Sequence, residues 1–192
     1  MAKRFPAIEA SHREFIERQR IFFVASAARE GRVNLSPKDR AALRLLGANR
    51  AAYLDVTGSG NETAAHIRKD GHVTLMFCAF EGPPMILRLY GRGKVLARGS
   101  KAFQEMLAAS FDGEERPGAR QIVVVDVDLV QTSCGYGVPL FEYSGERTTL
   151  TRWAEAKNEE QLRAYWREKN SSSIDGFPTG ILEANEPPEL SS

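Results

Sequence analysis

The stretch that decides the fold is LDVTGSGNETAAHIRKDGHVTLMF, residues 54–77. An apolar extended run ends here in a glycine-rich turn, which is followed by a short segment of helical spacing and by a second extended run. The turn, residues 57–60, contains two glycines that lack a Cβ, so the backbone can take positive φ and let a ligand approach its N–H groups closely. The helix is expected over residues 61–69, with Gly71 just beyond its end.

This turn has two interpretations. A helix N-terminus presents unsatisfied N–H groups and a partial positive charge, which suit a phosphate. Ser59 and Glu62 also fit the capping box S-x-x-E, in which Ser59 caps the helix and Glu62 folds back onto the cap. A glutamate in the first turn stabilises a helix but would repel a phosphate. On these residues alone the structural cap is favoured, and the anion site is the alternative.

Bulk properties limit the class of protein. The 192 residues fit a single domain, which we place at residues 1–182, with a disordered tail at residues 183–192. Because 26 basic residues balance 25 acidic ones, no global field recruits nucleic acid or an acidic membrane. No apolar run is long enough to span a bilayer or to direct export, so we expect a cytoplasmic protein. Cys78 and Cys134 lie far apart and fit neither a disulfide framework nor a metal site.

The remaining pattern predicts a mostly β domain. Extended runs are expected at residues 21–27, 32–36, 51–56, 72–80, 85–96 and 121–130. Helices are expected at residues 8–19, 100–111 and about 150–170. Pro37 is expected to end the second strand at Ser36, and Gly91 and Gly93 indicate a bulge or a barrel corner. Since gaps of hairpin length separate the strands, a small antiparallel barrel with flanking helices is favoured over a doubly wound sheet.

Three further groups of side chains carry possible chemistry. Asn34, Ser36 and Lys38 would share one side of an extended segment, where they could hold a phosphate and a polyol or could simply be the solvated face of a hairpin. Asp126 and Asp128 could form a carboxylate pair, although solvation of an edge strand is the favoured interpretation. His12 is expected at the surface. No nucleophilic triad or acid/base pair stands out, so the catalytic residues stay unknown.

Several segments together resemble one family. The chain is similar to the pyridoxamine 5'-phosphate oxidase-like proteins, which are FMN-binding split β-barrels, in residues 21–27, 31–38, 53–77, 134–139 and 169–178. The resemblance implies a split antiparallel β-barrel and a homodimer that holds FMN at the subunit interface.

The resemblance also implies a set of cofactor-binding residues. Asn34, Ser36 and Lys38 would meet the phosphate or the ribityl chain, and Val56 and Thr57 would lie beside the isoalloxazine through their backbone. The family's second phosphate-binding run corresponds to Asn61, Glu62 and Thr63, with Ser59 both capping the helix and joining the phosphate seat. In this sense the resemblance favours a cap and an anion site together, with Glu62 turned away from the ligand.

Departures from the oxidase itself shape the expected function. Glu62 and Thr63 replace basic residues of the oxidase, so charge neutralisation would depend on Lys38, with Arg68 or Arg32 as helpers. The oxidase's flavin-side glutamine and its carboxyl-terminal Arg and His pair have no counterpart in this chain. We therefore expect an FMN-dependent oxidoreductase acting on an unidentified small molecule. The alternatives are a non-catalytic flavin or haem carrier or sensor, and a structural dimer whose site has decayed.

Overall fold

We describe the fold from a computed structural model, which describes residues 2–183; most of the expected tail lies outside these residues. Eight strands form the body of the molecule: β1 (Lys3–Phe5), β2 (Ile21–Ser26), β3 (Asn34–Asp39), β4 (Leu43–Leu45), β5 (Arg50–Val56), β6 (His72–Cys78), β7 (Ile86–Ala97) and β8 (Ala119–Ser133). The helices are α1 (Ala10–Arg18), the 3-10 turn η1 (Arg40–Ala42), α2 (Glu62–Lys69), α3 (Lys101–Ser110), α4 (Thr149–Glu155) and α5 (Glu159–Lys169). None of the described helices is both long and apolar enough to cross a membrane.

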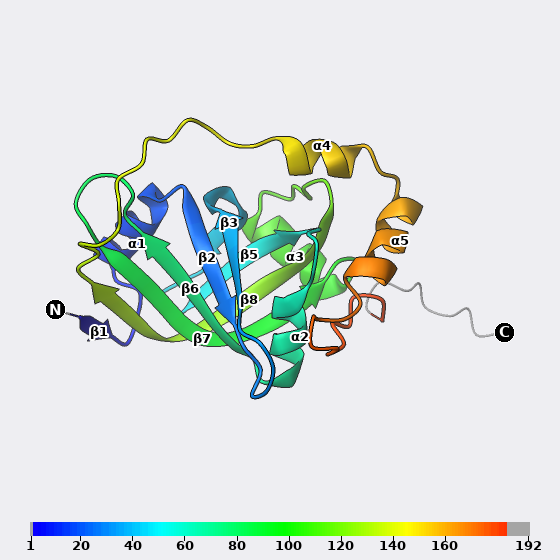
Figure 1. Cartoon of the computed structure of the whole chain (residues 1–192), viewed down its shortest axis with the longest axis horizontal. Coiled ribbons are helices and arrows are strands. Elements are labelled where there is room, and N and C mark those ends of the chain that lie inside the picture. Colours follow the sequence, from blue (N-terminus) through cyan, green and yellow to red (C-terminus); the bar gives the residue numbers. More distant parts are fainter. Residues whose placement is uncertain (1, 184–192) are drawn as a thin grey trace.

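The strands form one antiparallel sheet that curls into an incomplete barrel (Figure 1). Its order is β3-β2-β6-β7-β8-β5-β4, with β1 added alongside β8. The two edge strands, β3 and β4, are consecutive in the chain and are separated only by η1. Because so short a connection must bring the two edges together at one corner, the sheet is forced to curl. Among the described strands, β3 and β4 are not paired, so the barrel is split along this line.

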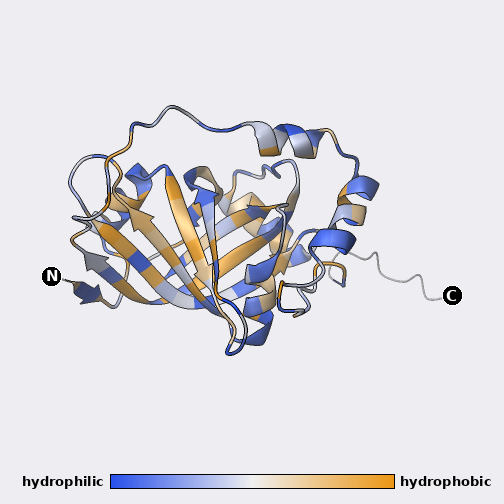
Figure 2. Ribbon diagram, in the orientation of Figure 1, coloured by the Kyte–Doolittle hydropathy of each residue, from blue (hydrophilic) through white to orange (hydrophobic). Residues whose placement is uncertain are grey.

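Two apolar clusters lie on opposite sides of the curled sheet. Alternate residues of β2, β5, β6, β7 and β8 fill the barrel interior, with Phe22, Tyr53, Phe77 and Leu89 fully buried. The outer side of β5 and β8 packs against α3 through Phe103. Hydrophobic residues accordingly gather on the strands in Figure 2, whereas α5 is mostly hydrophilic. The sheet therefore has buried residues on both faces where α3 covers it.

A bulge bends β7 and β8 as the glycines of β7 indicated. Tyr90 pairs with Leu129 but Gly91 pairs with Val127, so Asp128 is the extra residue on β8. A Cβ at Gly91 would lie 2.0 Å from the Asp126 carbonyl oxygen, which only glycine avoids. β8 is a central strand between β7 and β5. The interpretation of its two aspartates as solvating an edge was therefore wrong.

Other expected elements differ in detail. The helix expected at about 150–170 is two helices, because the Asn158 side chain accepts from the Gln161 N–H and begins α5 anew. β3 continues through Pro37 to Asp39, since an edge strand tolerates a residue that lacks an N–H. His12 is buried at 4% exposure and accepts from the Glu9 N–H, so its expected surface position was wrong.

Candidate functional site

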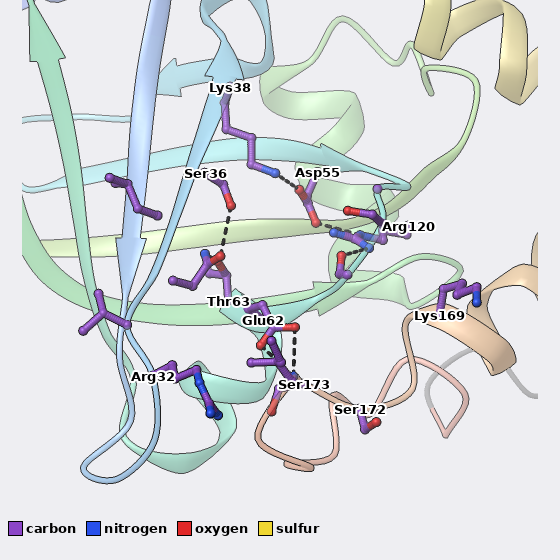
Figure 3. Close-up of a pocket in the computed structure, with 17 residues that line it drawn as sticks. Arg32, Ser36, Lys38, Asp55, Glu62, Thr63, Arg120, Lys169, Ser172 and Ser173 are labelled. Carbon is purple, nitrogen blue, oxygen red and sulfur yellow. Dashed lines mark hydrogen bonds and ion pairs between the residues drawn. The ribbon is translucent and has the colours of Figure 1, made fainter.

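A pocket of about 690 Å³ opens along the split in the barrel (Figure 3). Its walls come from the segment leading into β3 and β3 itself (residues 32–38), from the turn before α2 and the start of that helix (residues 58–63), and from the end of α5 and the chain after it (residues 169–174). Asp55 on β5 and Arg120 on β8 also line it. Segments far apart in sequence therefore meet at one concave surface.

The structure brings most of the predicted site residues to this surface. The predicted residues that line the pocket are Asn34, Ser36, Lys38, Ser59, Glu62 and Thr63. Val56, Thr57 and Asn61 adjoin it without being part of its lining. Thr57 is buried at 1% exposure, where its hydroxyl donates to the Gly118 carbonyl and accepts from Trp166 Nε1.

The glycines of the turn do not use the conformational freedom that the missing Cβ allows. Among the described residues, neither Gly58 nor Gly60 has positive φ. A Cβ at Gly58 would meet only the Gly60 carbonyl oxygen, at 3.9 Å. Neither backbone strain nor a steric clash therefore requires glycine at this position. Both glycines lie in the pocket lining. Their missing side chains thus leave backbone exposed to whatever enters the pocket.

The predicted capping box is not formed. α2 begins at Glu62 after Asn61, and no side chain of the described residues caps it. Glu62 reaches away from its helix and accepts from the Ile174 N–H at 3.0 and 3.2 Å (Figure 3). Asn61 instead accepts from Gln121 through Oδ1. Glu62 binds the segment after α5, so within the described part of the chain the N–H groups that begin α2 have no capping side chain.

Charge is concentrated at Asp55. Its carboxylate, 4% exposed, accepts from Lys38 Nζ at 2.6 Å, from Arg120 Nε at 2.8 Å and from Gln121 Nε2 at 2.9 Å. Burial alone would raise the pKa of Asp55, but the charges of Arg120 and Lys38 outweigh burial and hold its pKa below the ordinary value. Asp55 is therefore an ionised centre that fixes two cations at the pocket floor.

Arg120 is a site residue that sequence reasoning missed, because it falls just before the strand expected at residues 121–130. It is 4% exposed and donates to the Gly60 carbonyl and to Asn170 Oδ1, both at 2.8 to 2.9 Å. A signal was present in Asp55, which stands within an apolar strand. A buried carboxylate requires a buried partner.

Comparison with known proteins identifies the family of this chain. Residues 8–134 match the family model described as pyridoxamine 5'-phosphate oxidase. The chain belongs to this family. A pyridoxamine 5'-phosphate oxidase family protein of Aspergillus flavus, ustO, is 34% identical over 190 residues, which cover 91% of this chain and 76% of that protein.

Solved structures show the same fold. A point variant of HupZ from Group A Streptococcus superposes with a TM-score of 0.52 at 19% identity, over 66% of this chain and 99% of that one. A putative pyridoxamine 5'-phosphate oxidase from Lactobacillus delbrueckii gives a TM-score of 0.50 at 15% identity, over 66% and 94%. The expected split antiparallel barrel with flanking helices is confirmed. The pocket's third wall, residues 169–174, lies beyond the residues that the oxidase family model matches.

Proposed function

We propose that this protein binds FMN in the pocket along the barrel split and acts as a flavin-dependent oxidoreductase on a small molecule. The observation that carries the proposal is the pocket floor, where Lys38 and Arg120 lie side by side against one buried carboxylate. Membership of the oxidase family supports a flavin in general, and the residues of this chain favour a mononucleotide.

The residues present fit such a cofactor. A volume of about 690 Å³ lies within the range of roughly 300–1,000 Å³ that is usual for small-molecule sites. Hydroxyl and amide groups of Ser36, Thr63 and Asn34 line one side and suit phosphate and polyol oxygens. The rim is apolar, since Val33, Leu35 and Ile174 border the same pocket, and it suits an aromatic ring.

Each group has a definite task in this proposal. Lys38 would share its charge between Asp55 and the phosphate, and Asp55 would hold Lys38 and Arg120 in place. Backbone N–H groups at Ser59 and Gly60 would complete the seat. When bound, FMN supplies hydride and single-electron transfer, and the protein supplies binding, orientation and exclusion of water.

A second copy of the chain would complete the site. Val33, Leu35 and Ile174 are 61 to 72% exposed in the single chain, so an aromatic ring resting on them would have one face in water. The homodimer with the site at its interface is therefore part of the proposal.

Haem is a less suitable occupant. The described residues that line the pocket contain no His, Cys, Met or Tyr to serve as an axial ligand. A carrier or sensor of flavin would use the same seat as an enzyme. Reduction of bound FMN by a nicotinamide donor, followed by reoxidation in air, distinguishes the enzyme from the carrier.

The test is titration of the purified protein with FMN, followed by flavin fluorescence and visible absorbance, with riboflavin as the ligand without a phosphate. Lys38→Met is expected to weaken FMN binding at least tenfold and to leave riboflavin binding unchanged. Lys169→Met removes the same charge from the pocket edge, where Lys169 pairs with Glu168 instead, and serves as the matched control. Failure of the unaltered protein to bind FMN would refute the proposal.

A further inference from the structure

A chain of buried polar groups leads from the pocket into the barrel wall. Asn34 Nδ2 lies 3.3 Å from Thr63 Oγ1, Ser26 Oγ lies 3.3 Å from the same oxygen, and His66 Nδ1 lies 3.0 Å from Ser26 Oγ. Ser26 on β2 and His66 on α2 are 3% and 1% exposed, whereas Thr63 and Asn34 line the pocket. The phosphate seat proposed above does not account for His66.

The other nitrogen of His66 determines its tautomer. Within the described part of the chain, His66 Nε2 is buried and has no hydrogen-bond partner. The Nε2–H tautomer would leave a donor orphaned in the protein interior, which is rarer and more costly than an under-used acceptor. The neutral ring therefore carries its proton on Nδ1, and Nδ1–H donates to Ser26 Oγ.

This tautomer sets which group donates and which accepts in each hydrogen bond from His66 to Thr63. Ser26, which accepts from His66, donates its own proton to Thr63 Oγ1, and the Asn34 amide donates to the same oxygen. Both lone pairs of the Thr63 hydroxyl are then used, and its proton is left to be donated.

One internal acceptor competes for that proton. The buried Tyr53 Oη has no hydrogen bond of normal geometry among the described residues. Burial has the largest effect on the Tyr53 pKa and raises it, whereas the nearby Thr63 hydroxyl lowers it. An anion in the pocket is a stronger acceptor than a neutral phenol, because charge-assisted hydrogen bonds are roughly twice as strong as neutral ones.

We propose that His66 is a positioning residue: through Ser26 it turns the Thr63 hydroxyl into an obligatory donor, which selects an anionic or other acceptor group at that point of the pocket. The inference rests on the proposed function in so far as that group is the FMN phosphate. A ligand that presents an N–H or O–H donor to Thr63 would find no lone pair available.

The binding test compares FMN with riboflavin in five variants. His66→Leu and Ser26→Ala each interrupt the chain, and each is expected to weaken FMN binding about tenfold with riboflavin unchanged. His66→Asn keeps an amide donor near the position of Nδ1 and is expected to restore FMN affinity to within about threefold. In a Thr63→Val background, His66→Leu is expected to have no further effect, because His66 acts on the ligand only through the Thr63 hydroxyl.

A purely structural His66 would give a different result: FMN and riboflavin would weaken together, or His66→Asn would behave like His66→Leu. Nitrogen-15 NMR of the histidine rings, recorded on the unaltered protein without ligand, reads the tautomer directly. A proton on Nε2 overturns the proposal whether or not FMN binds. Absence of FMN binding combined with a proton on Nδ1 would refute the proposed function and the phosphate as ligand. The orientation of the hydrogen bonds from His66 to Thr63 would still be supported.

Discussion

At the scale of the residue, Asp55 connects three strands through charge. It lies on β5 and binds Lys38 from β3 across the split and Arg120 from the adjacent β8. An unpaired carboxylate buried to this degree would cost several kcal/mol, so its two cations and the Gln121 amide are a condition of folding.

Replacement of Asp55 by Asn is expected to lower the free energy of unfolding by about 3 kcal/mol at pH 7, because two cations lose their shared counter-ion. The loss has a definite pH dependence. Since the folded pKa of Asp55 is depressed, the unaltered protein has this stabilisation in full above the ordinary carboxyl pKa and loses it as pH falls toward the folded value. The difference between the two proteins should therefore shrink below about pH 4. Urea unfolding at a series of pH values measures it.

Asp126→Asn is the matched control. Asp126 pairs with Arg50, also across β5 and β8, but both side chains are more than half exposed. Exposed ion pairs contribute about 0–1 kcal/mol, so this variant should change stability little. Equal losses from the two substitutions would contradict the assigned role of Asp55.

At the scale of the element, α5 fixes the turn that forms the pocket wall. Trp166, which is fully buried, donates to Thr57 Oγ1 at 2.9 Å, and Asn170 Nδ2 donates to the Gly58 carbonyl at 3.0 Å. Asn170 also accepts from Arg120 at 2.9 Å. One helix end therefore holds both the backbone of the turn and the buried arginine.

Asn170→Ala is expected to cost about 2 kcal/mol of stability, because it leaves an Arg120 donor and the Gly58 carbonyl without this partner. FMN binding should weaken as well, since the turn is less firmly held. Thermal unfolding and FMN titration measure the two effects. Ser171→Ala is the control and should change neither, because among the described residues this exposed hydroxyl donates only to the Arg167 carbonyl of its own helix end.

The elements that the sequence predicted well are those whose pattern is local. The alternation of β8 and the glycine pair of β7 depend on neighbouring residues, and both positions were correct. The short strands β1 and β4 escaped notice because three residues hold too little pattern, and their pairing with β8 and β5 depends on distant residues. The break before α5 was missed because its cap, Asn158, lies in a run of otherwise helical spacing.

The candidate site shows the same difference between local pattern and distant contacts. Asn34, Ser36 and Lys38 follow from strand periodicity and do share one wall of the pocket. Glu62 was given a local partner, its own helix cap, but it bonds to Ile174, more than a hundred residues along the chain. Arg120 and the buried His66 became visible only when the sheet brought β8 and β2 to the turn.

At the scale of the whole molecule, apolar surface is left uncovered on one extended segment. The chain between β8 and α4 runs along the top of the view in Figure 1. It exposes Tyr136 at 82% and Leu140 at 74%, although Phe141 anchors it through its N–H to the Phe80 carbonyl. We expect these exposed apolar side chains to contribute to a protein interface. A second copy of the chain is the occupant that the proposed site requires.

We expect the protein in solution to have twice the 21.3 kDa mass of one chain. Leu140→Glu places a charge in this surface, where burial would require desolvation of a carboxylate, and should shift the protein to the monomer and reduce its affinity for FMN. Lys101→Gln changes the net charge by the same single unit at a fully solvated position of α3 and should leave the dimer intact. Sedimentation equilibrium measures both. A Leu140→Glu protein that remains dimeric would place the interface elsewhere, and an unaltered protein that sediments as a monomer would refute the dimer.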